Sequence, residues 1–338
     1  MNAPKSLRIP LFTFDWPGAC SPYAQTVEKH VIEWADHHRL IDDSDLRART
    51  IRARYGWLAA RCYPTAPLDV LETIADYIAW LFLVDDLFFD RVQTLSPRTV
   101  AHITAIIDVF DLNILQPQPI FGERALFDLC QRLRRQLGTD QFQHFAHGTR
   151  MMYCGAPLQT LAHLNSAPIT LRQYECIRRQ GSGLIPCMLL IECTTGTQLE
   201  ADWRFSPDVQ QLRDATNTIV SLSNDIHSLN VELKQPGQHK NMVTLQSGQQ
   251  HELQQVIDLT AHRVLAEIEN FSERSEQLLI NAPPGLKQYI QGLKYWLSGH
   301  QRWVESDTLR YASEFADNDA DQNAVASKLR CTDDQKTS

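Results

Sequence analysis

Three carboxylates interrupt an otherwise apolar stretch, Leu-Phe-Leu-Val-Asp-Asp-Leu-Phe-Phe-Asp, at Asp85, Asp86 and Asp90. In a helix, Asp86 and Asp90 share a face about 6 Å apart along the axis, and Asp85 lies about 100° around it. Ionised carboxylates beside a core are costly unless they are paired or bind a metal. Hard oxygen ligands of this kind suit Mg²⁺, which fills its other positions with water and phosphate. The alternative is an ordinary acidic helix end that reaches solvent.

A second polar pattern, Asn-Asp-Ile-His-Ser-Leu-Asn-Val-Glu, places Asn224, Ser228 and Glu232 at a spacing of four residues. On a helix these side chains stay within roughly 80° of one another. An amide oxygen, a hydroxyl and a carboxylate on one face form a compact ligand set for a hard cation. Taken alone, the pattern is more typical of a solvated helix face.

Together the two segments resemble the two metal-binding motifs of bacterial class I terpene synthases, an aspartate-rich motif and an Asn-x-x-x-Ser-x-x-x-Glu motif on a facing helix. Arg178 lies 46 residues before Asn224, where the resemblance implies an arginine that senses diphosphate. Arg310 and Tyr311 match a C-terminal Arg-Tyr pair that contacts diphosphate. The resemblance covers about residues 10–311.

The resemblance also assigns residues to substrate binding. Phe82 lies one turn before Asp86, and Trp303 precedes Arg310 by seven residues, on the same face of a predicted helix. These spacings predict that each aromatic ring faces the same site. Aromatic faces there can stabilise cations, although plain core packing explains them equally well. Residues 181–183 match the helix break of the family. The full substrate-binding set is Phe82, Phe89, Gly181, Ser182, Gly183, Lys234 and Trp303.

Some positions depart from the family pattern. The aspartate motif reads DDxxxD rather than DDxxD, which weakens the assignment of Asp90 as a ligand more than those of Asp85 and Asp86. Val231 occupies a position that is often basic, and Lys234 is the candidate substitute. The second DDxxD motif of chain-elongating prenyltransferases is absent from the sequence, which favours cyclisation over elongation.

The elements that position these residues are predicted to be helices. Ala, Leu, Gln, Glu and Arg dominate the long segments, and apolar residues recur at steps of three and four. We therefore expect an all-α fold, a single class I terpene synthase bundle around a central apolar cavity. Breakers divide the chain into about ten helical pieces; they lie near 64–67, 116–122, 155–157, 166–168, 206–207, 235–239 and 282–285.

We expect the chain to consist of three parts. An irregular segment covers 1–20, the cyclase domain covers 21–311, and a disordered acidic tail covers 312–338. No linker interrupts the middle part, so we expect one compact domain rather than two.

The charge and the apolar content of the sequence disfavour two kinds of partner, nucleic acids and membranes. The 32 basic and 40 acidic residues give a formal charge of −8, which disfavours nucleic-acid binding. The most apolar stretch, 78–89, is too short to span a bilayer, and no signal peptide is apparent, so a cytoplasmic location is expected. A homodimer is compatible with the sequence.

The resemblance implies a lyase that uses three Mg²⁺ ions, with Mn²⁺ as a substitute, to ionise and cyclise a prenyl diphosphate. The C15 substrate, farnesyl diphosphate, is expected from the frequency of sesquiterpene synthases among chains of this length. Alternatives on the same fold are a monoterpene or diterpene synthase and an enzyme that releases linear alcohols. A non-catalytic helical interaction protein is the remaining alternative.

Overall fold

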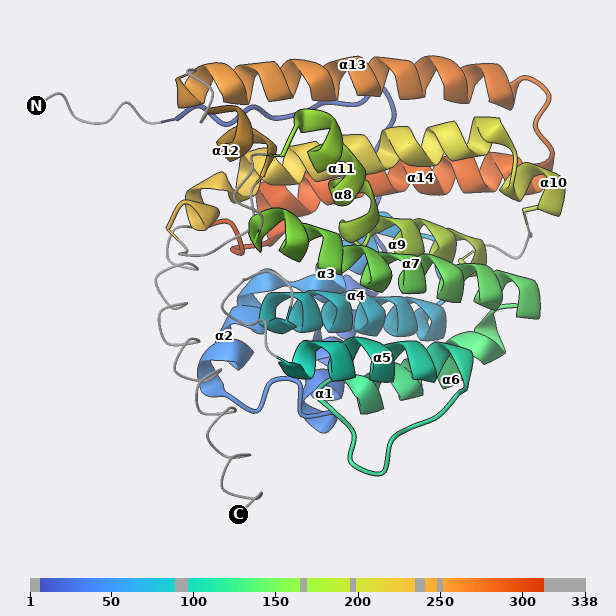
Figure 1. The fold of residues 1–338 in the computed structure, drawn as a ribbon. Helices are drawn as coiled ribbons and strands as arrows, with labels where there is room; N and C mark the ends of the chain where they lie inside the picture. Colours follow the sequence, from blue (N-terminus) through green and yellow to red (C-terminus); the bar gives the residue numbers. More distant parts are fainter. Residues whose placement is uncertain are drawn as a thin grey trace, which may run out of the picture.

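The structure is a computed structural model that describes residues 7–88, 97–164, 169–194, 199–234, 241–247 and 252–312. These residues contain helices and no strand, as the sequence predicts (Figure 1). No helix among them is long and apolar enough to cross a membrane. The elements are α1 (Ala24–His37), α2 (Ser44–Ala53), α3 (Tyr55–Cys62), α4 (Leu68–Phe88), α5 (Pro97–Asp111), α6 (Glu123–Gln136), α7 (Thr139–Leu164), α8 (Leu171–Gly181), α9 (Leu184–Leu189), η2 (Leu190–Cys193), α10 (Ala201–Arg204), α11 (Pro207–Glu232), α12 (Met242–Ser247), α13 (Leu253–Leu279), α14 (Pro284–Arg302) and the π-helical turn η3 (Trp303–Asp307).

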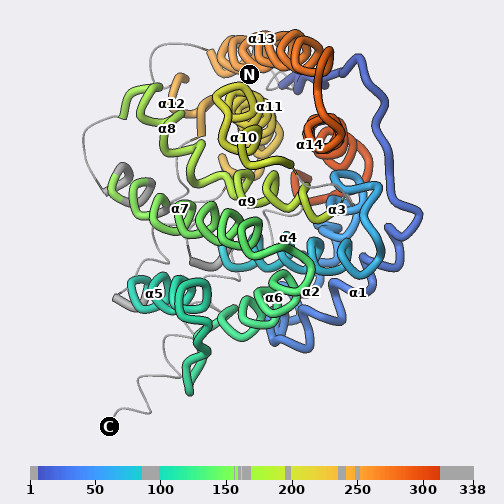
Figure 2. Tube along the Cα trace, turned by 90° about the vertical axis from the view of Figure 1, so that its right-hand side faces the viewer, coloured from blue at the N-terminus to red at the C-terminus, as the bar shows by residue number. Residues whose placement is uncertain are grey.

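Two long helices organise the bundle. Helix α4 packs against α1, α3 and α6, and it is apolar around most of its circumference, with Leu71, Ile74 and Val84 fully buried. A helix that is hydrophobic on all sides belongs in a core rather than on a surface. Helix α11 packs against α8, α9, α12, α13 and α14, which surround it in the view of Figure 2. Helix α11 carries the whole Asn-Ser-Glu motif, and α4 carries the start of the aspartate motif.

Local sequence signals explain where the helices near the site begin. Ser206 caps α11 by accepting a hydrogen bond from the Val209 amide at 3.2 Å, and Pro207 occupies the first turn. Thr170 and Gln173 form a capping box at the start of α8. These short-range contacts fix the starts of the two helices that carry Arg178 and the Asn-Ser-Glu motif.

Most predicted breakers also separate helices in the structure. The segments at 64–67, 116–122, 206–207 and 282–285 each lie at a junction between successive helices. The breakers at 166–168 and 235–239 lie outside the described residues.

One expected boundary is wrong. The Gly-Ala-Pro segment at 155–157 lies inside α7, which continues to Leu164 with Pro157 within it. Proline removes one backbone hydrogen bond from a helix, but α7 packs against α8 and α9, and such tertiary contacts outweigh one local preference. The described residues also contain fourteen α-helices rather than about ten, because short turns separate several of them without a cluster of breakers.

The N-terminal segment has no helix before Ala24 among its described residues, as expected. It nevertheless packs along α13 and α14 (Figure 1). The Trp16 indole donates to the Lys294 carbonyl at 3.0 Å, and its ring centroid lies 5.6 Å from that of Phe271. The segment is therefore part of the packed structure, although its sequence predicts no regular element. The acidic tail expected from residue 312 lies almost wholly outside the described residues.

Buried histidines predict acid sensitivity. Burial lowers the pKa of His102 on α5 to about 4. In an unfolded chain the same ring titrates near 6.5, so between these values the unfolded state binds more protons. The contribution of His102 to the free energy of unfolding should therefore fall by about 1.4 kcal/mol for each pH unit below 6.5, until the pH approaches 4.

Urea unfolding at pH 7, 6 and 5 should show that the free energy of unfolding decreases less in His102→Gln than in the parent protein. His262 is exposed, so His262→Gln is the matched control and should decrease as the parent does. An equal decrease in all three proteins would contradict the prediction.

Candidate active site

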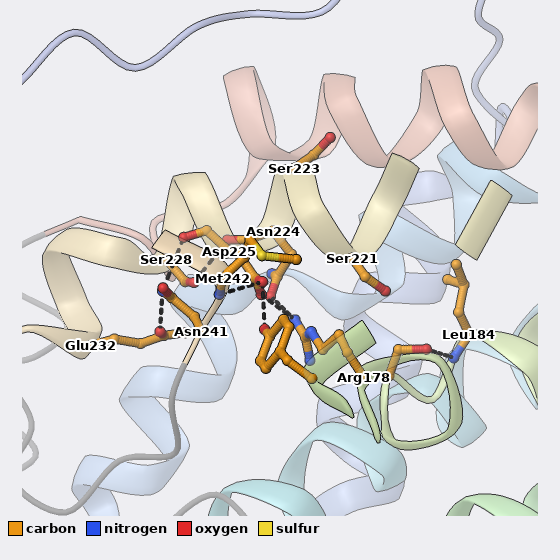
Figure 3. Close-up of polar contacts among 12 residues, drawn as sticks. Arg178, Leu184, Ser221, Ser223, Asn224, Asp225, Ser228, Glu232, Asn241 and Met242 are labelled. Carbon is orange, nitrogen blue, oxygen red and sulfur yellow. Dashed lines mark hydrogen bonds and ion pairs between the residues drawn. The ribbon is translucent and has the colours of Figure 1, made fainter. Parts of the chain in front are cut away.

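The Asn224, Ser228 and Glu232 side chains come from the C-terminal end of α11 (Figure 3). The helix is continuous through all three residues, so the predicted spacing holds and they share one face. Ser228 is 7% exposed, and its hydroxyl donates to the Asn224 carbonyl at 2.7 Å. An amide, a hydroxyl and a carboxylate on adjacent turns fit the oxygen chemistry that Mg²⁺ requires.

The Asn224 side chain bonds to residues from two other parts of the chain. Its amide oxygen accepts a hydrogen bond from Arg178 Nη2 of α8 at 2.8 Å. Its amide nitrogen donates to the Tyr311 hydroxyl at 2.7 Å. A predicted metal ligand and two predicted diphosphate donors therefore meet at one point. Burial raises the pKa of Tyr311 to about 12, so the hydroxyl stays protonated at neutral pH and can also donate.

A buried carboxylate that the sequence analysis did not single out supports this cluster. Asp225 is 1% exposed and accepts hydrogen bonds from the Tyr174 hydroxyl at 2.5 Å and the Met242 amide at 3.1 Å. Arg178 Nη2 lies 3.0 Å from its other oxygen. Because a buried charge needs partners, Asp225 both orients Arg178 and attaches the start of α12 to α11. Tyr174 precedes Arg178 by one helical turn and therefore lies on the same face of α8. This spacing is the signal in the sequence that could have identified Tyr174 as part of the site.

The two consecutive arginines of α8 point in different directions. Arg178 points toward α11, whereas Arg179 is exposed. The predicted helix break follows at once, because α8 ends at Gly181 and α9 begins at Leu184. Gly183 has φ +72°, a left-handed conformation that favours glycine, and an added Cβ would lie 2.6 Å from Leu81 Cδ2. The backbone conformation of the break therefore favours Gly183, and any larger residue would also require Leu81 to shift.

A polar contact secures the break against α11. The Ser182 hydroxyl donates to Asn217 Oδ1 at 3.2 Å and accepts from the Leu184 amide at 3.2 Å. Asn217 in turn donates to the Arg179 carbonyl at 3.0 Å. Asn217 lies one turn before Ser221, whose hydroxyl also donates to its amide oxygen. The sequence analysis missed Asn217, since nothing local distinguishes it from other polar residues of α11.

Aromatic rings connect α4 with the C-terminal residues. Phe82 stacks on Tyr55, with ring centroids 4.8 Å apart, and the Arg310 guanidinium lies 4.9 Å from the Phe82 centroid. Arg310 Nη1 also donates to the Tyr55 hydroxyl at 3.1 Å. The Trp303 centroid lies 6.3 Å from that of Phe82 and 5.9 Å from that of Tyr311. A continuous aromatic path therefore runs from the aspartate-motif helix to the residues that contact α11.

The helical spacing predicted between Trp303 and Arg310 is wrong, because no regular helix connects them. Helix α14 ends at Arg302, the π-helical turn covers Trp303–Asp307, and Thr308 is extended. The buried Trp303 indole is held instead by the carbonyls of Ala53 and Arg54, at 3.1 and 3.0 Å. Packing on the α2–α3 junction, rather than helical spacing, brings its ring beside Tyr311.

The aspartate motif is described only in part. Asp85 lies partly exposed near the end of α4. Burial raises the pKa of Tyr153, and the charge of Asp85 adds to this effect. The side chain of Asp86, and Phe89 and Asp90 entirely, lie outside the described residues. Within the described ranges, no three His, Cys, Asp or Glu residues are grouped to hold a metal.

Lys234 lies exposed beyond the end of α11, while Val231 is buried. The two positions therefore do not share an environment, although only three residues separate them in sequence. The suggestion that Lys234 replaces a basic residue at position 231 stays a prediction.

Comparison with known proteins places the chain in one family. The family model "Terpene synthase family 2, C-terminal metal binding" matches residues 76–270, more than half of the chain. A sesquiterpene synthase of Metarhizium brunneum is 46% identical over 95% of this chain and 94% of its own. A (+)-corvol ether B/(+)-corvol ether A synthase of Kitasatospora setae, named as cyclising (2E,6E)-farnesyl diphosphate, is 45% identical over 94% of this chain and 99% of its own.

Solved structures show the same fold. Hedycaryol synthase in complex with HEPES superposes with a TM-score of 0.75 at 23% identity, covering 89% of this chain and 99% of that chain. The SVS_A2 protein from ancestral sequence reconstruction superposes with a TM-score of 0.80 at 21% identity, covering 89% and 91%. Because relatives of similar identity include a fungal protein, the resemblance is not confined to bacterial members. The chain is therefore a member of the class I terpene synthases.

Proposed function

We propose that the protein ionises farnesyl diphosphate with the help of Mg²⁺ and cyclises the resulting allylic cation to a sesquiterpene hydrocarbon or alcohol. The observation that carries the proposal is the meeting of Arg178, Asn224 and Tyr311, which combines a metal-ligand face with donors for an anion. Relatives named as sesquiterpene synthases over nearly the whole chain support the C15 substrate.

The chemistry follows from charge. Diphosphate leaves easily only when its negative charge is neutralised, and bound Mg²⁺ supplies Lewis-acid stabilisation for this departure. The residues that would hold the ions are Asn224, Ser228 and Glu232 of α11, with Asp85 and Asp86 of α4. Asp90, which lies outside the described residues, stays a predicted ligand.

The arginines and the tyrosine act on the leaving group. Arg178 presents charge-assisted donors from α8, and Arg310 presents its guanidinium from above the Phe82 ring. Tyr311, which stays protonated, adds a neutral donor. The aromatic rings of Phe82 and Trp303 then offer faces that stabilise positive charge in a site from which water is excluded.

Removal of metal provides the test. We expect purified protein with Mg²⁺ to convert farnesyl diphosphate to a cyclic C15 product in gas chromatography–mass spectrometry, in preference to the geranyl and geranylgeranyl diphosphates. EDTA should abolish turnover and added Mg²⁺ restore it, because all proposed ligands are hard oxygens. Undiminished activity after exhaustive chelation contradicts the proposal, and linear alcohols alone would favour the non-cyclising alternative.

Four further expectations stay predictions. They are the cytoplasmic location, the homodimer, the use of three ions and substitution by Mn²⁺.

A further inference from the structure

Asn241 lies nine residues after Glu232, at the start of α12, and is 3% exposed. Its amide nitrogen donates two hydrogen bonds, one to Glu232 Oε2 at 2.6 Å and one to the Asp225 carbonyl at 3.1 Å. Its amide oxygen accepts from the Thr244 backbone N–H at 2.8 Å. Both ends of this buried amide are therefore used, and one of its partners is a predicted metal ligand (Figure 3).

The helix cap determines which way the amide faces. Thr244 and Asn241 cap the helix reciprocally, because the Asn241 backbone N–H also donates to the Thr244 hydroxyl at 3.1 Å. A flipped side chain would place its NH₂ against the Thr244 N–H and its oxygen against two acceptors, Glu232 Oε2 and the Asp225 carbonyl. The cap thus directs the donor end of Asn241 toward Glu232.

The position of α12 is itself held by α11. Met242, the next residue, donates its backbone N–H to Asp225 Oδ2 at 3.1 Å. Two consecutive residues at the start of α12 therefore bind the motif segment of α11, so Asn241 reaches Glu232 from a rigid support. Glu232 needs such support because it is the last residue of α11 and only partly buried, where a long side chain has several rotamers to lose.

We propose that Asn241 is a positioning residue of the metal site, which holds the Glu232 carboxylate in the orientation that binds Mg²⁺. The inference rests on the proposed function, since it takes Glu232 as a ligand. The hydrogen bond to a carboxylate is charge-assisted and short. Loss of such an outer partner of a metal ligand typically costs about 10–100-fold in metal affinity.

The test separates this role from the capping role. Asn241→Ser keeps an oxygen that can cap α12 but removes the amide NH₂ group that reaches Glu232, because the serine side chain is shorter. Asn241→Thr serves the same purpose if the serine variant does not fold. Thr244→Ala is the matched control, because it removes the hydroxyl that accepts from the Asn241 backbone N–H. It keeps the Thr244 backbone N–H that orients the Asn241 amide, and with it the Asn241–Glu232 bond. Calorimetric titration of the full chain with inorganic diphosphate over a series of Mg²⁺ concentrations measures the half-saturating Mg²⁺ without turnover.

We expect Asn241→Ser to raise the half-saturating Mg²⁺ by about 10–100-fold with an unchanged circular dichroism spectrum, and Thr244→Ala to leave it unchanged. An equal shift in both variants would overturn the inference, because packing of α12 alone would then explain it. A normal Mg²⁺ requirement in Asn241→Ser, beside lost binding in Glu232→Ala, would overturn the inference and leave the proposed function intact. Unchanged Mg²⁺-dependent diphosphate binding in Glu232→Ala would instead show that Glu232 is not a metal ligand. Both the inference about Asn241 and the proposed function rely on that assignment.

Discussion

Turnover should fall to background in Glu232→Ala and in Asn224→Ala, while the helical fold persists. Each change removes an oxygen from the proposed metal face of α11, and Lewis-acid stabilisation of the departing diphosphate is worth several kcal/mol. A loss of about 4 kcal/mol corresponds to roughly a thousandfold in rate. Asn224→Ala should also remove the hydrogen bonds that its amide makes with Tyr311 and Arg178. Steady-state assays with farnesyl diphosphate at saturating Mg²⁺ measure the effect.

The control lies on the same helix. Asn230 is exposed on α11, between Ser228 and Glu232 in sequence, so Asn230→Ala makes the same chemical change on a different face. It should retain the activity of the parent protein. Circular dichroism and urea unfolding should show that all three variants keep the helical fold. Parent-like rates in both motif variants would show that this face of α11 is only solvated surface.

Arg178→Ala should lower the rate of a single turnover by roughly two to three orders of magnitude, and Arg179→Ala should lower it far less. A donor aimed at developing negative charge is worth about 3–4 kcal/mol in other enzymes. Arg178 faces Asn224 and Asp225, whereas Arg179 is exposed. Arg178→Lys should restore only part of the rate, because a point charge cannot reproduce the planar fork of the guanidinium.

Arg178 also neutralises a buried carboxylate, so its removal affects stability as well as rate. Asp225 keeps the hydrogen bonds from Tyr174 and the Met242 amide, which should limit the loss. The single-turnover assays should therefore be run well below the unfolding temperature of each variant, with farnesyl diphosphate and saturating Mg²⁺. An inactive Arg179 variant beside a near-normal Arg178 variant would refute the assignment of Arg178 as the diphosphate sensor.

The all-α class and several helix boundaries could be predicted from the sequence, because caps and breakers act over a few residues. Ser206 starts α11, and Gly183 separates α8 from α9. The same reasoning failed at Pro157, where packing of α7 against α8 and α9 outweighs one lost hydrogen bond. It also failed for the helical link from Trp303 to Arg310, since the π-helical turn ends the regular spacing.

In the candidate site, too, local helix geometry could be predicted and contacts between helices could not. The shared face of Asn224, Ser228 and Glu232 follows from helix geometry, which a sequence already specifies at about 100° per residue. The partners of those residues do not follow from it. Asp225 meets Tyr174 across 51 residues of chain, and Asn224 meets Tyr311 across 87. Such pairs depend on how whole helices pack, and packing sums many weak contacts that no short segment of sequence contains.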